Sequence, residues 1–159
     1  MGDKMSTFRE DLSNLNAHAA HNPWRISDRN YLPYVGNGYL GVSADDPDAV
    51  LHAFGARHLS VPIPFKPLAV VTPDPSRVFG EESVTLVHYL NGMVTRVGCY
   101  TTHGGAELSV TQQVYAHRAF PSILVQEIKM ANPSSENVVF NVERLGIAGW
   151  TNARSRTKT

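Results

Sequence analysis

The feature that most constrains the fold is a long series of alternating segments in the second half of the chain. Apolar and polar residues alternate there, and turn-forming residues such as Asn, Gly and Pro separate one segment from the next. A period of two is typical of β-strands with one buried face. Strands that recur at intervals of about ten to fifteen residues predict an antiparallel meander within an all-β sandwich. The predicted strands cover residues 84–90, 93–102, 107–118, 122–132 and 137–145.

The clearest turn signal in this series is Asn91-Gly92, which stands between two alternating segments. Such a pair favours a two-residue type I′ turn, because both central residues then need positive φ. The sequence therefore predicts a β-hairpin centred on these two residues.

The first part of the chain differs from the strand-rich part. Thr7 to Glu10 resembles a helix-capping box, and apolar residues follow at helical spacing. We expect a short amphipathic helix from about Phe8 to Ala20, because Asn22-Pro23 disfavours its continuation. The sequence thus predicts a helical and polar segment over 1–30, a β-sandwich domain over 31–150, and a basic tail or truncated continuation over 151–159.

Six prolines lie between residues 45 and 80. Proline has no N–H to give to a β-ladder, so this density favours edge strands and extended loops over central strands.

The charge balance limits the classes of partner. Lys plus Arg and Asp plus Glu are 14 each, so no overall field favours nucleic acid or an anionic membrane. The single cysteine, Cys99, excludes an intrachain disulfide, and we expect it to be a buried small hydrophobic residue. The polar start predicts no signal peptide, and no apolar run reaches the roughly 20 residues of a membrane helix. The chain is predicted to be soluble as given.

The motifs of several enzyme classes are missing from the sequence. No serine stands in a G-x-S-x-G elbow, and no phosphate-binding G-x-x-x-x-G-K-[ST] motif occurs. The adjacent acids Glu81-Glu82 and Asp45-Asp46 are expected to be solvated loop charges, and Asp74 to be structural. His18 and His21 share one helical face, but no third metal ligand stands nearby. We therefore predict no catalytic residue, no metal site and no cofactor.

Two polar stretches supply the candidate binding residues. His117 and Arg118 end a predicted strand, where they can hold a carboxylate, contact a sugar or pin a loop. Gly36-Asn37-Gly38 interrupts a strand pattern and marks a bend, a bulge or a close backbone approach. Within it, Asn37 and Tyr39 are candidates for contact with a sugar or a partner domain. Tyr34, Tyr39 and Trp150 are alternative sugar-stacking platforms or, in the competing interpretation, core residues.

Three motifs carry a family resemblance, namely NGYLG at 37–41, the Gly92 to Arg96 hairpin, and Q-x-x-Y-A-H-R at 112–118. In this order the chain resembles the N-terminal β-sandwich, of super-sandwich type, of glycoside hydrolase family 65. That family includes maltose and kojibiose phosphorylases, acid trehalases and a collagen glucosylgalactosylhydroxylysine glucosidase. The stretches at 61–68 and 129–140 are still more similar to an uncharacterised animal membrane-protein family with a similar luminal domain.

The resemblance implies a role without catalysis for this chain. In family 65 the catalytic glutamate lies on a helical barrel that follows the sandwich, and these 159 residues contain no such barrel. The resemblance therefore implies an accessory sandwich that packs on a missing C-terminal domain of a glycosidase or phosphorylase, with carbohydrate as a possible ligand. The alternative is a binding or structural module of a non-enzymatic relative. In both cases the full-length protein is expected in the secretory lumen or anchored to its membrane.

Overall fold

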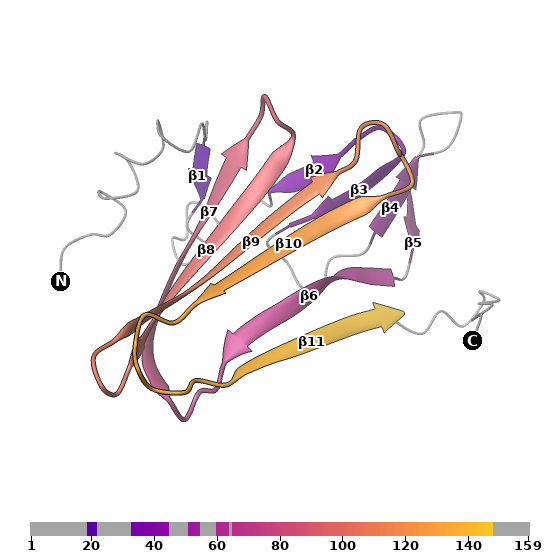
Figure 1. Cartoon of the computed structure of the whole chain (residues 1–159). Helices are drawn as coiled ribbons and strands as arrows, with labels where there is room; N and C mark the ends of the chain where they lie inside the picture. Colours follow the sequence, from indigo (N-terminus) through magenta and orange to yellow (C-terminus); the bar gives the residue numbers. More distant parts are fainter. Residues whose placement is uncertain (1–18, 22–32, 45–50, 55–59, 64, 148–159) are drawn as a thin grey trace.

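The structure, a computed structural model, describes residues 19–21, 33–44, 51–54, 60–63 and 65–147 (Figure 1). This part of the chain consists of antiparallel β-strands and loops and contains no helix. The strands are β1 (Ala19–His21), β2 (Tyr34–Gly36), β3 (Leu40–Ser43), β4 (Leu51–Phe54), β5 (Ser60–Ile63), β6 (Phe65–Pro73), β7 (Val78–His88), β8 (Met93–Thr102), β9 (Glu107–Ala116), β10 (Leu124–Ala131) and β11 (Phe140–Ile147).

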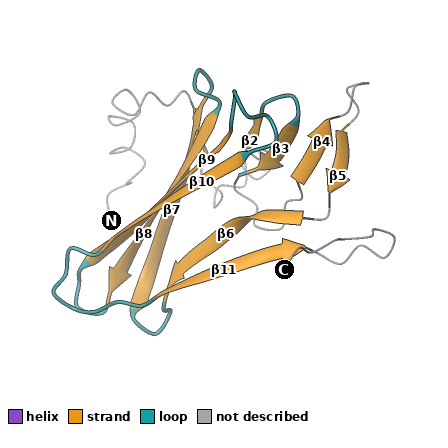
Figure 2. Cartoon of the chain, turned by 45° about the vertical axis from the view of Figure 1, so that its right-hand side comes forward, coloured by secondary structure: helices purple, strands orange, loops and turns teal. Residues whose placement is uncertain are grey.

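One layer is a five-stranded sheet in the order β1-β7-β8-β9-β10. Its last four strands follow one another in sequence and in space, so the predicted meander is confirmed over these strands. The opposing layer contains the β6–β11 pair and a four-stranded sheet in the order β2-β3-β4-β5 (Figures 1 and 2). The predicted all-β antiparallel sandwich is therefore the observed fold.

Two clusters of buried apolar residues lie between the layers. Alternation along β8 and β9 turns every second side chain toward the opposing layer, as expected for a half-buried sheet. The first cluster joins β8 and β9 to β2, β3 and β6, through Val35, Val42, Leu68, Val94 and Val114. The second joins the far halves of β8 and β9 to β6, through Val71, Tyr100, Leu108 and Val110. Strand β6 contributes to both clusters, so its position fixes how the two layers pack.

The N-terminal prediction needs one correction. Most of the expected helix, together with His18, lies outside the described residues, and so does Trp150. Ala19 and Ala20, however, lie in β1 and pair with Val87 and Leu86, so the helix prediction is wrong for these two residues. Their backbone groups pair with the edge of β7, and such tertiary pairing outweighs the weak helix propensity of a short segment.

The β7–β8 hairpin is confirmed, but its turn is longer than predicted. His88 pairs with Met93, which leaves a four-residue loop over 89–92. The Gly92 N–H donates to the Tyr89 carbonyl at 3.4 Å, and Gly92 takes the left-handed conformation with φ of 60°. Four-residue loops are commonly built around a type I turn. The two-residue type I′ turn is therefore wrong.

The last predicted strand leaves the meander. β11 pairs with β6 instead of β10, which a local pattern cannot indicate because the partner lies about seventy positions earlier. The proline-rich stretch does supply edge strands, as predicted. Pro62 lies in β5, the last strand of its sheet, and Pro67 lies where the β6–β11 register shifts at a bulge.

Gly36-Asn37-Gly38 ends β2 and begins the turn of the β2–β3 hairpin. Gly36 pairs with Gly41, and the Asn37 N–H donates to the Leu40 carbonyl at 3.1 Å. Gly38, the first of the two residues between Asn37 and Leu40, has φ of 82°. Two-residue turns of type II′ place glycine at this position.

A valine at position 38 is expected to lower the free energy of unfolding by about 1–2 kcal/mol, because β-branched residues are strained at positive φ. No heavy atom lies within 4 Å of the place where a Cβ would stand, so the cost comes from the backbone and not from crowding. Chemical denaturation of Gly38→Val and Gly38→Asn measures this. Asparagine is a non-glycine residue type that adopts positive φ more readily than valine does, so it should lose less; equal stability of the valine variant and the parent would contradict the assignment.

Candidate functional site

The predicted binding residues gather at one end of the sandwich, which we call the loop end. It consists of the β2–β3 turn (37–39), the β7–β8 loop (89–92) and the β9–β10 loop (117–123), which lie close together in Figures 1 and 2. Hydrogen bonds link the β9–β10 loop to each of the other two.

Asn37 joins the β2–β3 turn to the β9–β10 loop. Its Oδ1 accepts hydrogen bonds from the backbone N–H groups of Tyr39 and Leu40, both at 2.9 Å. Its Nδ2 donates to the carbonyl oxygens of His117 at 2.9 Å and Pro121 at 3.0 Å. An asparagine amide offers two N–H donors and one carbonyl acceptor. All of these groups are engaged with the backbone.

His117 shapes the β9–β10 loop from within. Its Nδ1 accepts from the N–H groups of Ala119 at 3.2 Å and Phe120 at 3.0 Å. Its backbone N–H donates to the Ile123 carbonyl at 2.9 Å, and the rings of His117 and Phe120 lie 5.0 Å apart. Because Nδ1 is an acceptor, the proton of the neutral ring is on Nε2.

Arg118 links the β9–β10 loop to the β7–β8 loop, because its Nη2 donates to the Leu90 carbonyl at 2.9 Å. The structure thus brings Asn37, His117 and Arg118 together as contacts within and between loops. Tyr39 lies beside them with its side chain half exposed, at 50%. Ligand binding by these four residues stays a prediction.

The large apolar side chains of the loop end are exposed to solvent. Five of them are between 44% and 77% exposed, namely Tyr39, Tyr89, Leu90, Phe120 and Ile123. We call this set the apolar rim. Surface loops usually turn polar groups toward water, whereas polar groups here bind the loops together and apolar groups face outward. Near the rim lies a hollow of about 230 Å³, and Arg118 is the one charged residue among the described residues that line it.

Tyr34 is less suited to be a sugar platform than its exposure suggests. Its ring lies against the backbone of Gly41, where it occupies the space that a Cβ would need. Partial burial raises the pKa of its phenol. Tyr34 therefore covers the β2–β3 hairpin.

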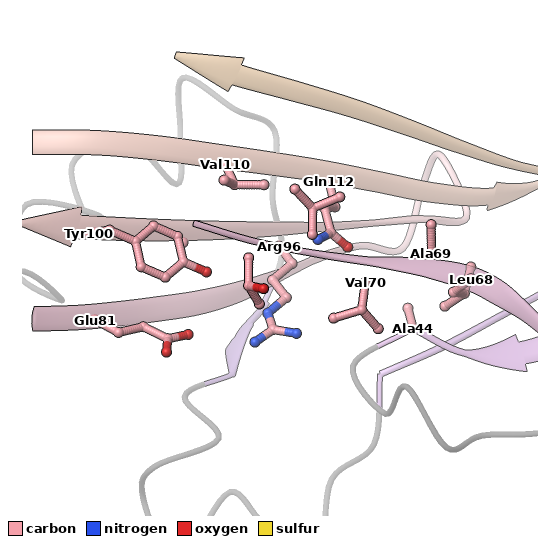
Figure 3. Close-up of a pocket in the computed structure, with 12 residues that line it drawn as sticks. Ala44, Leu68, Ala69, Val70, Glu81, Arg96, Tyr100, Val110 and Gln112 are labelled. Carbon is pink, nitrogen blue, oxygen red and sulfur yellow. The ribbon is translucent and has the colours of Figure 1, made fainter. Parts of the chain in front are cut away.

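A second group of polar residues lines a cleft between the layers, away from the predicted binding residues. Glu81 and Glu82, expected to be solvated loop charges, are exposed but lie in β7, so the predicted loop position is wrong. A cleft of about 50 Å³ between β6 and the inner face of the five-stranded sheet is lined by Glu81, Arg96, Tyr100 and Gln112, among others (Figure 3). For Arg96 a signal was present, because alternation along β8 places it on the same face as buried Val94 and Tyr100. A polar residue at an inward position is thus visible in the sequence alone.

Gln126 crosses from β10 to β6 beside this cleft. The Ala69 N–H donates to Gln126 Oε1 at 2.8 Å, and Gln126 Nε2 donates to the Ala69 carbonyl at 3.0 Å. The same Nε2 lies 3.3 Å from Gln112 Oε1. The side chain therefore pairs with β6 as a neighbouring strand would.

Metal chemistry finds no support in the described part of the chain, where no three His, Cys, Asp or Glu side chains come together as a group. In the same residues, no helix combines the length and apolar character that a membrane span requires.

Fold and loop end together define the class of protein, an antiparallel β-sandwich with an interlocked set of loops at one end. The chain belongs to the family described as "Uncharacterized conserved protein (DUF2152)", which matches residues 13–157. Searches of curated proteins and of solved structures give no match. The resemblance to glycoside hydrolase family 65 therefore stays a prediction.

Proposed function

We propose that the chain is a non-catalytic accessory β-sandwich of a glycoside-hydrolase-like protein, and that its loop end packs against a helical catalytic domain. The observation that carries this proposal is the orientation of side chains at the loop end. Asn37, His117 and Arg118 make their hydrogen bonds to the loops themselves, while the apolar rim faces outward.

Loops held in place before binding suit a docking role. A partner that binds mobile loops must overcome their conformational entropy, whereas fixed loops reduce this cost. Large apolar side chains, aromatic ones above all, commonly form the centres of protein interfaces. The apolar rim has three rings and two aliphatic side chains of this kind, namely Tyr39, Tyr89, Phe120, Leu90 and Ile123.

The three motifs of the family 65 resemblance support the choice of partner. Asn37 of the first motif binds the backbone of His117 in the third, and Arg118 of the third binds the loop that contains Gly92 of the second. Because hydrogen bonds join the three motifs at the loop end, the motifs are suited to act together in docking the catalytic domain. The same resemblance predicts a full-length protein in the lumen of the secretory pathway or anchored to its membrane.

Hydroxyl-radical footprinting tests the proposal by comparing the 159-residue chain with the full-length protein. We expect Tyr39, Tyr89 and Phe120 to be oxidised in the chain and at least fivefold less in the full-length protein. Phe79 is the control, since it is 66% exposed and lies at the start of β7, whereas the β7–β8 loop of the loop end follows the last residue of that strand. Equal oxidation of the three rim rings in both proteins would overturn the proposal.

A further inference from the structure

A second hollow lies at the end of the sandwich opposite the loop end. It measures about 400 Å³ and opens between the β6–β7 turn and β8. We call it the β6–β7 hollow. Its lining combines apolar walls with a few polar groups, as small-molecule sites commonly do. The lining residues are Thr72, Pro73, Pro75, Val78, Phe79, Gly80, Glu81 and Tyr100.

The charged group on the wall of this hollow is the carboxylate of Glu81, which also lines the neighbouring cleft together with Arg96. Glu81 is the one acidic residue among the described residues that line the hollow, and neither lysine nor arginine is among them. The Tyr100 hydroxyl is hydrogen-bonded to the Glu81 side chain. Burial and the nearby Glu81 carboxylate raise the pKa of Tyr100, against a smaller opposing effect of Arg96. The phenol therefore stays protonated at neutral pH and orients the carboxylate.

An aromatic residue in a β-bulge also lines the hollow. The β7–β8 register shifts between Val78 and Gly80, and a bulge changes the direction of the side chain that it contains. Phe79 lies in this shift and is 66% exposed, with its ring 5.7 Å from that of His103.

The opposite wall is held by the β6–β7 turn. Asp74 Oδ1 accepts from the Ser76 N–H at 2.9 Å, and the Asp74 carbonyl accepts from the Arg77 N–H at 2.9 Å. The Asp74 N–H donates to the Val139 carbonyl at 2.9 Å. These bonds fix Pro73 and Pro75 on either side of Asp74. The turn confirms that Asp74 is structural, and its hydrogen bonds from Ser76 lower the pKa of its carboxyl.

We propose that the β6–β7 hollow binds a small quaternary ammonium ion. Such a cation is weakly hydrated and carries its charge on an apolar surface, so it packs against Pro, Val and aromatic walls while it neutralises a carboxylate. Glu81 supplies the countercharge, Phe79 and Tyr100 supply the aromatic groups, and Pro73, Pro75 and Val78 supply the apolar walls. An anion would be repelled by Glu81, the one charged residue among the described residues that line the hollow.

Titration of the ¹⁵N-labelled chain with choline tests this proposal by NMR. We expect saturable shifts of the backbone amides of Thr72, Gly80 and Tyr100. The neutral isostere 3,3-dimethylbutan-1-ol should bind at least fivefold more weakly, because it has the same shape without the charge.

A matched pair of variants locates the countercharge. Glu81→Gln should weaken choline binding at least tenfold. Glu82→Gln should leave it unchanged, because the neighbouring side chain points to the other face of β7. Dispersed spectra show that both variants are folded. The proposal is overturned by equal binding of the neutral alcohol, by binding that Glu81→Gln leaves intact, or by a folded parent chain that shows no saturable shift.

Discussion

Replacing Asn37 with alanine is expected to lower the free energy of unfolding by about 2–4 kcal/mol, at roughly 1 kcal/mol for each hydrogen bond lost. The amide makes four such bonds, two within the β2–β3 turn and two to the β9–β10 loop. Two of these four are partly shielded from water. Their backbone partners would therefore lose a bond that water replaces incompletely. Urea denaturation, followed by far-UV circular dichroism, measures the change in the free energy of unfolding.

Two further variants separate the roles of the Asn37 amide. Asn37→Asp keeps the acceptor for Tyr39 and Leu40 but places a carboxylate opposite two carbonyl oxygens, so it should be as unstable as the alanine variant at neutral pH. Its stability should partly recover where the carboxyl group is protonated and becomes a donor. Asn91→Ala, in an exposed position of the same loop end, should change stability by less than about 0.5 kcal/mol. An Asn37→Ala variant as stable as the parent would remove Asn37 as the link between the loops.

Gln126→Leu is expected to cost about 2–3 kcal/mol, because it leaves a backbone N–H and a carbonyl of Ala69 without their partner. Leucine has a similar volume, so the loss reports on hydrogen bonds rather than on a cavity. Since β6 contributes to both core clusters, loosening it from β10 affects the packing of the two layers. Thermal and chemical denaturation measure the effect.

Gln113→Leu is the control for this variant. Gln113 lies on β9, on the face opposite to that of Gln112, and its replacement should change stability by less than about 0.5 kcal/mol. Equal losses in the two variants would show that Gln126 does not join the layers.

Gln126 also explains how the second edge of β6 is protected. Ala69 directs its N–H and carbonyl toward Gln126 and away from β11. Strand alternation then directs Val71 and Pro73 to the same side, and Pro73 has no N–H to offer there. Edge strands protected in this way resist pairing with other chains. The proline density of this stretch therefore has a structural purpose.

The parts of the fold that the sequence predicts are the local ones. Alternation and turn residues indicate β7 to β10 because each pair is joined by a short loop. The pairing of β11 with β6 joins segments far apart in the chain, and no local pattern contains that information. The helix prediction failed at Ala19 and Ala20 for the same reason, because their partner is the edge of β7.

In the candidate site, too, the sequence indicates local features but not the contacts between distant segments. Residue types singled out Asn37, His117 and Arg118, but they do not tell which groups those side chains contact. Asn37 donates to carbonyl oxygens 80 and 84 positions away, which only the assembled sandwich brings near. Arg96, in contrast, was named only as the end of the Gly92 to Arg96 motif, although the alternation of β8 alone places it on the face of Val94 and Tyr100.

In this structure the polar residues of the loop end hold its loops together. Hydrogen exchange of side-chain amides, measured by NMR, is a direct test of this role. Both Nδ2 protons of Asn37 are donated to backbone carbonyls, at 2.9 and 3.0 Å, so we expect them to exchange at least tenfold more slowly than those of exposed Asn91. Asn37 protons that exchange as fast as those of Asn91 would contradict this role.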